Sequence, residues 1–427
     1  MGQISGLFTL GQQQLGVGTN TDEWVSEFQD TILVRNARGI GNGSTLFGLM
    51  SRLKNEPVET TEYKWFERDP AIREIQVDNQ STAYTSSDTT IFVDDGSVAT
   101  AAAGGVAGVV QIGTILRTSF GEQVRVTGGT SAGVAVANAS GRTQLTITRA
   151  FNGVAGTGGA GLADNNKLVV LTLGQAEGAN PIAPVYQTPT TLVNYIQTYN
   201  AAVSLTNAFK GSKLRTDLEG PLRERRIQAL ERITRDIELS FFFGTKSVTQ
   251  ATTGNLYYTG GITNSIDQIA TSPTQVLAGG GSGGVALATF NAWMASFLTL
   301  GSDAKIAFCG PQAYAAISNY ANAGTNGYRI TGQESVYGMN ITEINTPFGQ
   351  LSMTMHPLFK EISTYNDWMV VVDLGLLVQK VMEPLFLEPN IQTPGQDTYL
   401  EQFRGKYGVK LKFPQAFGYA TALQKLT

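Results

Sequence analysis

Residues Gly220 to Gly244 read GPLRERRIQALERITRDIELSFFFG, and the rest of the chain is organised around this stretch. Pro221 suits a first helical position, where its missing N–H has no partner within the helix. Gly244 suits the left-handed residue that follows a helix end. Because apolar residues recur every three or four positions between them, the stretch predicts an amphipathic helix about 34 Å long. Its predicted core face consists of Ile227, Leu230, Ile233, Ile237 and Phe241.

The remaining positions of this helix concentrate charge in a chain that is otherwise poor in it, since only 15% of the residues are charged. Glu231 with Arg235 and Arg232 with Asp236 have the i,i+4 spacing that supports a helix on its solvent side. The predicted charged face consists of Arg225, Arg232, Arg235 and Asp236. Such a helix either lies across a sheet with a solvated side, or presents that side to a cavity or a neighbouring subunit.

Length and composition limit the class of protein. A chain of 427 residues has room for two or three domains with a substantial core. Its 49 glycines and low charge are typical of a loop-rich β or α+β protein with extensive contact surfaces. The net charge of −4 argues against nucleic-acid binding through a broad basic surface. The longest charge-free run, Gly96 to Leu116, predicts a loop leading into a strand, so we expect no membrane span.

Residues for catalysis and metal binding are scarce. One cysteine, Cys309, and one histidine, His356, exclude an intrachain disulfide and a zinc site of Cys and His ligands. Gly129 to Gly133 matches G-x-S-x-G around Ser131, but the following residues predict a turn where a hydrolase needs a helix. A Gly-rich hairpin turn is the preferred interpretation, and a serine hydrolase using Ser131 and His356 is the alternative. We expect no enzyme activity, cofactor or metal.

The beginning of the chain predicts an arm with short helical pieces. Met1 to Gly18 is rich in Gly and Gln, and it lacks the basic and apolar regions of a secretion signal. Thr21 caps a predicted short helix with Trp24, Phe28 and Ile32 at i, i+4 and i+8. A second short helix is predicted through Leu46, Leu49, Met50 and Leu53.

Strands are predicted on both sides of the long helix. Val58–Arg68 and Thr89–Val93 predict an extended hairpin that projects from the subunit. Four short strands with Gly-rich turns then predict a small inserted β-barrel or sandwich. Thr190–Val203 predicts a long strand before the helix, and alternating helices and strands after it predict an α/β or α+β lobe. The predicted contact residues of the hairpin are Tyr63, Trp65 and Phe66.

In combination, seven short stretches of this sequence resemble the major capsid proteins of tailed bacteriophages. Within that group, the order of elements is similar to the family with a small β-barrel inserted ahead of the long helix. The stretches that carry the resemblance are Glu62–Trp65, Glu122–Thr127, Thr146–Gly153, Gln175–Gly178, Asn194–Gln197, Asp236–Glu238 and Tyr258–Ile262.

The resemblance implies an α+β capsid fold divided into six segments. The long helix would be the spine helix of a peripheral domain, and the hairpin would reach over a neighbouring subunit. The implied segments are an N-terminal arm (1–56), an extended-loop hairpin (57–100), an inserted β-barrel or sandwich (101–178), a peripheral domain (179–284) with spine helix 220–244, an axial domain (285–388) and a C-terminal return to the peripheral domain (389–427).

The resemblance also implies a structural function. Subunits would self-assemble through pentamers and hexamers into an icosahedral shell that encloses packaged double-stranded DNA without sequence-specific binding. Implied partners are scaffolding, portal and cement proteins, and the implied location is the virion capsid, with assembly in the host cytoplasm. A nanocompartment shell that encloses proteins has the same fold and is the nearest alternative, although such shells seldom contain the inserted barrel.

Overall fold

The structure is a computed structural model, and it describes most of the chain from Leu46 onward. The residues outside the description are 1–45, 54, 69–72, 79–82, 86, 95–109, 129–134, 138–141, 155–161, 176, 179–188, 212–220, 252–253, 270–273, 281–282, 323–329, 337–338, 347 and 427. The predicted short helix after Thr21 therefore lies outside the described residues.

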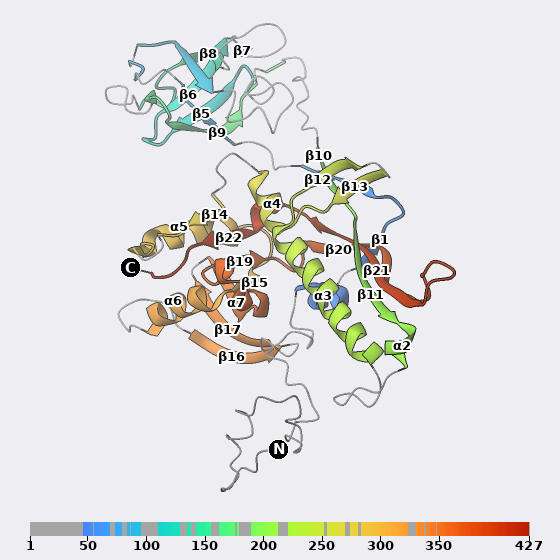
Figure 1. Cartoon of the computed structure of the whole chain (residues 1–427). Helices are drawn as coiled ribbons and strands as arrows, with labels where there is room; N and C mark the ends of the chain where they lie inside the picture. Colours follow the sequence, from blue (N-terminus) through green and yellow to red (C-terminus); the bar gives the residue numbers. More distant parts are fainter. Residues whose placement is uncertain are drawn as a thin grey trace, which may run out of the picture. The chain divides into compact units, whose positions relative to one another are not determined.

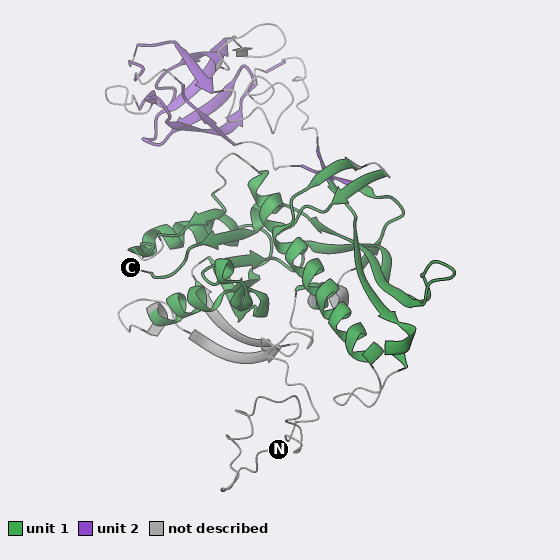
Figure 2. Ribbon diagram, viewed as in Figure 1, with its two compact units in different colours: residues 1–63, 194–427 green, residues 64–193 purple. Residues whose placement is uncertain are grey.

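The chain divides into two compact units (Figure 2). Unit 1 combines residues 1–63 with 194–427, and unit 2 comprises residues 64–193. The boundaries fall within two strands that pair with each other, β2 (Glu62–Glu67) and β10 (Thr190–Tyr195). Each unit has its own buried apolar core.

The first layer of unit 1 is a four-stranded sheet covered by the long helix α3 (Pro221–Phe243) (Figure 1). In β11 every second residue is buried, because alternate side chains of a strand point to the same face. The predicted long strand is interrupted at Ile196, so β10 ends there and β11 continues to the start of α2 (Asn207–Lys210). The sheet order is β1 (Asn55–Pro57), β20 (Leu377–Glu388), β21 (Thr398–Leu411) and β11 (Gln197–Thr206).

The second sheet of unit 1 has seven strands. Alternate residues of its central strand β15 belong to different cores: Phe308 packs with α3, and Cys309 packs with α5 (Leu287–Leu298) and α6 (Pro311–Asn322). The sheet is thus covered on both faces. Its order is β14 (Val276–Ala278), β22 (Gly418–Thr421), β19 (Met369–Val372), β15 (Ala304–Cys309), β18 (Gly349–Met355), β17 (Met339–Thr346) and β16 (Ile330–Val336).

Short elements complete unit 1. The predicted helix through Leu46 and Met50 is confirmed as α1 (Leu46–Leu53), and both side chains are buried in the core beneath α3. The remaining elements are β12 (Ser247–Ala251), β13 (Gly254–Tyr258), α4 (Ile262–Asp267), α7 (Pro357–Glu361) and the 3-10 turns η4 (Ser363–Tyr365) and η5 (Pro414–Ala416).

Unit 2 is a single β structure. An isolated bridge between Val77 and Val93 connects its two outermost strands, so the strands follow one another around a closed path. Strand β7 (Ala135–Ala137) pairs with β8 outside this path. The order is β3 (Glu74–Gln76), β9 (Lys167–Leu173), β5 (Thr114–Thr118), β6 (Gln123–Gly128), β8 (Arg142–Thr148) and β4 (Thr90–Asp94).

The prediction that 58–68 pairs with 89–93 as a projecting hairpin is wrong. Strand β2 pairs with β10, whereas β4 pairs with β8 inside unit 2. The alternating pattern identified both strands, but a period of two gives no information about the partner strand. Ile91 and Val93 are fully buried in the core of unit 2, and a projecting hairpin would have left them in water.

Candidate functional site

Helix α3 is the long helix that the sequence predicts, and it packs against β11 and β21 (Figure 1). Three residues of the predicted core face, Ile233, Ile237 and Phe241, are fully buried. Ile227 and Leu230 were predicted on the same face, but they are 47% and 41% exposed. That part of the predicted face is wrong.

The reason lies in the spacing of the buried residues on α3. The buried stripe advances four residues at a time, through Ala229, Ile233, Ile237 and Phe241. Since a helix has 3.6 residues per turn, each step of four rotates the stripe by about 40° around the axis. In the first half of the helix the buried side is therefore at Ala229. Leu230 points about 100° and Ile227 about 160° away from Ala229 around the axis, which explains their exposure.

A carboxylate inside the core caps the N-terminal helix. Glu238 of α3 is 1% exposed and accepts hydrogen bonds from the backbone N–H groups of Leu46 and Phe47, the latter at 2.8 Å. These are the first N–H groups of α1, and they have no partners within that helix. A negative charge at this end also complements the helix dipole. Glu238 was missed as a site residue because its cap partners lie almost 200 positions away in sequence.

His356 binds the same carboxylate. Its Nε2 lies 2.9 Å from Oε1 of Glu238, and its ring packs against Phe242 and Phe359. Since the carboxylate only accepts, Nε2 is the nitrogen that donates. The side chain is fully buried, so a substrate cannot reach it, which opposes the hydrolase interpretation. Ser131, the other residue of that interpretation, lies outside the described residues.

A two-pronged ion pair joins α3 to the four-stranded sheet. Arg226 donates from Nε to Oε1 of Glu401 at 2.7 Å and from Nη2 to Oε2 at 2.6 Å. The hydroxyl of Tyr399 donates a third bond to the same carboxylate at 2.9 Å. Burial raises the pKa of Glu401, but these bonds outweigh burial and hold the pKa below its usual range. No sequence pattern pairs residues that are 175 positions apart.

The predicted charged face of α3 is divided between solvent and a neighbouring helix. Arg225, Arg232 and Asp236 are exposed. Arg235 is half-buried, and its Nη1 lies 3.3 Å from Oε2 of Glu361 at the end of α7. Three of the four charges are thus available for contacts outside the subunit, and the fourth connects two elements of unit 1.

The three predicted contact residues of β2 differ in their exposure to solvent. Tyr63 is buried in its own subunit, where its hydroxyl donates to the carbonyl of Val409 at 2.7 Å, so its assignment to an intersubunit contact is wrong. Trp65 is half-buried and donates from Nε1 to Glu67 at 2.8 Å. Phe66 is 71% exposed, and of the three it alone presents a large apolar surface to solvent.

A buried lysine of the second sheet binds the C-terminal end of α5. Lys305 of β15 is 1% exposed, and its Nζ donates to the carbonyls of Phe297, Leu300 and Ala416 at 2.6 to 2.8 Å. Burial lowers the pKa of Lys305 to about 8, and Asp373, 3.9 Å away, acts in the opposite direction. Because an ammonium group has three donors, three carbonyls satisfy it completely. The sequence analysis did not single out Lys305, because its carbonyl partners lie in three different segments.

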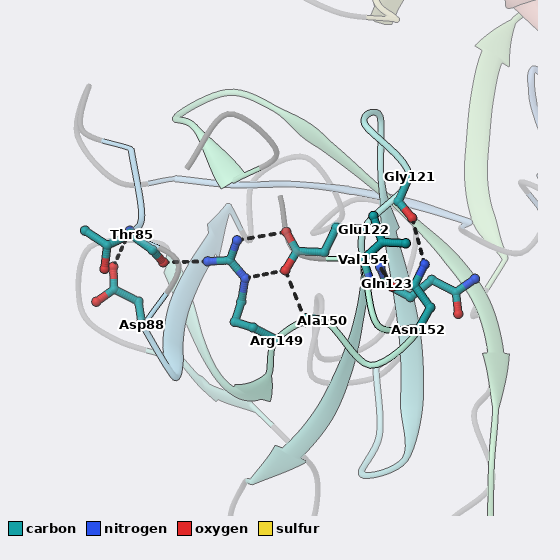
Figure 3. A network of polar contacts seen from close by, with 9 residues as sticks. All are labelled: Thr85, Asp88, Gly121, Glu122, Gln123, Arg149, Ala150, Asn152 and Val154. Carbon is teal, nitrogen blue, oxygen red and sulfur yellow. Dashed lines mark hydrogen bonds and ion pairs between the residues drawn. The ribbon is translucent and has the colours of Figure 1, made fainter. Parts of the chain in front are cut away.

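Unit 2 also contains an arginine–glutamate pair with two hydrogen bonds, and Figure 3 shows it among its neighbours. Arg149 donates from Nε and Nη2 to the two oxygens of Glu122 at 2.7 and 2.8 Å. Its Nη1 donates to the carbonyl of Thr85 at 2.6 Å. Glu122 is 1% exposed and also accepts from the backbone N–H of Ala150 at 3.3 Å. The pair therefore joins the start of β6, the end of β8 and the segment before β4.

The turn after β8 is shaped by an asparagine. Oδ1 of Asn152 accepts from the backbone N–H groups of Gln123 and Val154, and its Nδ2 donates to the carbonyl of Gly121 (Figure 3). Ala150, which begins this turn, has a φ of 50°, in the left-handed region. These contacts bring together two of the stretches on which the resemblance was based, Glu122–Thr127 and Thr146–Gly153. In this chain the two stretches also pair with each other as β6 and β8, and their ends build this turn.

Metal and membrane sites were also sought in the described part of the chain. There, no group of His, Cys, Asp and Glu side chains is arranged to hold a metal ion. None of the helices in the same residues is long and apolar enough to cross a membrane.

Comparison with protein families gives a match that covers most of the chain. The family model described as SU10 major capsid protein matches residues 39–424. No curated protein matches the chain.

Several solved structures have a distantly similar chain. A chain of Microbacterium phage Oxtober96 is 10% identical with a TM-score of 0.42, and the match covers 95% of this chain and 96% of that one. The capsid of a native GTA particle is 8% identical with a TM-score of 0.44, with 95% and 97% covered. The holo-SrpI encapsulin complex from Synechococcus elongatus PCC 7942 is 10% identical with a TM-score of 0.41, with 98% and 96% covered.

Proposed function

The chain belongs to the SU10 major capsid protein family and is a structural subunit of a viral capsid shell, and we propose that this shell is icosahedral and encloses packaged double-stranded DNA. The membership confirms the resemblance to major capsid proteins that the sequence suggested. The match over residues 39–424 is the observation that carries the proposal.

The geometry of α3 supports a role as the spine of the subunit. Glu238 holds α1, Arg226 holds the four-stranded sheet and Arg235 holds α7, so one helix connects three parts of unit 1. Its exposed charges, Arg225 and Arg232 among them, are left for a neighbouring subunit, a scaffolding protein or the genome. A helix that is fixed on several sides keeps its exposed side in a constant position, which a repeated contact requires.

The hairpin β12–β13 supports contact with further copies of the chain. It is a two-stranded sheet of its own, and Val248, Leu256 and Tyr258 on it are 42% to 48% exposed. A two-stranded sheet is marginally stable in water, so burial against a neighbour would stabilise it. The proposed assemblies are pentamers and hexamers, with scaffolding, portal and cement proteins as further partners.

The proposal includes three further points. The protein has no enzyme activity, which is supported by the burial of its only histidine, His356. The subunits assemble in the host cytoplasm. DNA is enclosed without recognition of its sequence, as the acidic net charge of −4 favours. The six predicted segments are retained as a proposed division, except that residues 57–100 do not form a hairpin of their own.

The contents of purified particles test the proposal. Particles are treated with DNase while intact, the enzyme is removed, and the shells are then opened and extracted. Double-stranded DNA of uniform length that survives this treatment is the expected result. A stoichiometric cargo protein in place of protected DNA would contradict the proposal and indicate a nanocompartment.

A further inference from the structure

Asn152 is followed directly by Gly153 in the exposed turn after β8, and Figure 3 shows the hydrogen bonds that surround Asn152. An asparagine before a glycine is prone to modify itself, because glycine has no Cβ to hinder the approach of its backbone nitrogen to the preceding side chain. The reaction needs no enzyme, and water is its only co-reactant. Its rate therefore depends on how freely the turn moves.

The reaction replaces the side-chain amide by a carboxyl group. The nitrogen of Gly153 gives its proton to water and attacks Cγ of Asn152. A bond forms between this nitrogen and Cγ, the bond between Cγ and Nδ2 breaks, and Nδ2 takes up a proton and leaves as ammonia. Water then adds to either carbonyl of the cyclic imide and opens it. The product is aspartate, or isoaspartate, in which the main chain runs through Cβ and Cγ of the former side chain.

The carboxamide of Asn152 is held at both of its polar atoms. Its Oδ1 accepts from the backbone N–H groups of Gln123 at 3.2 Å and Val154 at 3.3 Å. Its Nδ2 donates to the carbonyl of Gly121 at 3.1 Å. The side chain therefore has a fixed orientation in the folded turn, and the nitrogen that has to leave is bound.

The attacking nitrogen is held as well. The N–H of Gly153 donates to the carbonyl of Ala150 at 2.9 Å, so the proton that must be lost first is shared with an acceptor. The N–H of Phe151 donates to the carbonyl of Gln123 at 2.9 Å, and the N–H of Ala150 donates to the buried Glu122 at 3.3 Å. The turn has to open before Gly153 can react.

The protection comes from hydrogen bonds and not from burial. Residues 151–154 are exposed, so water reaches the site. The two donors at Oδ1 would also stabilise the negative charge that an attack places on this oxygen, as an oxyanion hole does. That effect acts only after an attack has begun, and the bond from Gly153 to Ala150 opposes its beginning.

We propose that Asn152 is a site of self-modification that stays unreacted in the folded turn of unit 2 and reacts when unit 2 is open. The product does not rebuild the turn. Aspartate lacks the Nδ2 donor and places a carboxylate oxygen against the carbonyl of Gly121. Isoaspartate lengthens the main chain of a tight turn in which Ala150 and Gly153 are left-handed, with φ of 50° and 74°. The modification thus permanently marks each chain whose unit 2 has remained unfolded.

Peptide mapping by mass spectrometry of the full-length chain at mildly alkaline pH measures the reaction. The conversion of Asn152 is followed in the folded chain and in the same chain unfolded in guanidinium chloride. We expect conversion to be slower in the folded chain by about tenfold or more, because several hydrogen bonds of the turn must open first. Equal rates would overturn the proposal. Faster conversion in the folded chain would also overturn it, because the donors at Oδ1 would then assist the attack.

Two controls use the unfolded chain. Asn42 and Asn326 also precede a glycine, and they should react there at rates similar to that of Asn152, since the local sequence then sets the rate. Gly153→Ala should slow the conversion of Asn152 by about tenfold or more, because a Cβ hinders the attack. An unchanged rate in this variant would mean that the nitrogen of residue 153 is not the attacking atom, and the proposal would be wrong.

Hydrogen exchange tests the consequence for folding. One sample is kept unfolded until Asn152 is converted, a second is unfolded only briefly, and both are returned to buffer. Amides of β6 and β8 should exchange faster by about tenfold or more in the first sample, because the hydrogen bonds of the turn are lost. Equal exchange in the two samples would contradict the proposed effect on the turn.

The matched control for this experiment is Gly153→Ala, treated in the same two ways. In this variant Asn42 and Asn326 are converted while Asn152 is not, so its two samples should exchange alike at β6 and β8. No measurement involves particles, so the outcome does not depend on whether the chain forms shells.

Discussion

An arginine–glutamate pair with two parallel hydrogen bonds and a buried carboxylate is found in each unit of the molecule. In unit 1, Arg226 meets Glu401 with two bonds of 2.7 and 2.6 Å. In unit 2, Arg149 meets Glu122 with two bonds of 2.7 and 2.8 Å. Both carboxylates are almost completely buried, and each accepts a further hydrogen bond.

The two pairs differ in the elements that they connect and in the solvent exposure of the arginine side chain. The partners in unit 1 are 175 positions apart and join a helix to a sheet, whereas those in unit 2 are 27 apart and close a local turn. The arginine side chain is 37% exposed in unit 1 and 8% exposed in unit 2. The pair in unit 1 therefore joins distant parts of the chain, whereas the pair in unit 2 joins two strands that lie close in the sequence.

The largest expected effect comes from breaking the core of unit 1. Ile233→Asp places a carboxylate without a partner under α3, and this destabilises unit 1 by several kcal/mol, a large share of a typical domain's stability. Hydrogen exchange should show loss of protection throughout unit 1, while the strands of unit 2 stay protected. Simultaneous loss in both units would mean that they do not fold independently.

The next largest effect is expected when the negative charge of the buried pair in unit 2 is removed. Glu122→Gln leaves the Arg149 guanidinium buried without its counter-charge, which should lower the free energy of unfolding of unit 2 by about 3–5 kcal/mol. Glu401→Gln should cost unit 1 less, about 1–3 kcal/mol, because water reaches Arg226. Denaturant unfolding, followed by hydrogen exchange in each unit, measures both changes in the free energy of unfolding.

The matched control is Glu177→Gln at an exposed site, for which we expect a free energy of unfolding within about 0.5 kcal/mol of that of the natural chain. An equal or larger loss in Glu401→Gln would contradict the comparison.

A smaller effect on stability is expected when the pH is lowered, through the more exposed pair of unit 1, Arg226 and Glu401. The pKa of Glu401 is held below its usual value of 4.5 in the folded chain, so the unfolded chain takes up this proton first on acidification. The stabilisation is complete above pH 4.5 and is lost as the pH falls through the folded-state pKa. The stability of unit 1 should therefore fall more steeply below pH 4.5 in the natural chain than in Glu401→Gln. Identical slopes would mean that Glu401 does not contribute to acid unfolding.

The smallest effect on folding is expected at the exposed charges of α3. Arg225→Ala/Arg232→Ala should change stability by about 0–1 kcal/mol for each residue, because both side chains are exposed. Circular dichroism should show a folded subunit, whereas particle imaging should show failure to form DNA-filled particles. Normal filled particles would mean that these charges are only the solvated side of a helix.

Local pattern predicted the elements of this fold well. Pro221 and Gly244 marked the ends of α3 correctly, and the apolar spacing located α1. The left-handed conformation expected of Gly244 is wrong: its φ is not positive, and a side chain is excluded there because a Cβ would meet the backbone oxygens of Ser240 and Thr259. Ile233, Ile237 and Phe241 were correctly placed in the core because they follow the four-residue stripe of the second half of α3. Ile227 and Leu230 were misplaced because the buried stripe rotates around α3 and lies at Ala229 in the first half of the helix, which a spacing of three or four residues does not show.

Contacts between residues that are distant in the sequence could not be predicted from it. The pairing of β2 with β10, and the binding of Glu238 to His356 and to the start of α1, join residues that no periodic pattern relates. Buried charges were missed for the same reason. Glu238 and Lys305 look like surface residues until the groups that satisfy their hydrogen bonds are known.

The most direct test of the central claim, that this chain is a shell-forming capsid subunit, is sedimentation velocity of the purified full-length protein, with electron microscopy of the fastest fraction. The account predicts rapidly sedimenting species that appear in images as closed shells or capsomer-like rings. A single compact monomer of 45.6 kDa under every assembly condition tried would contradict it.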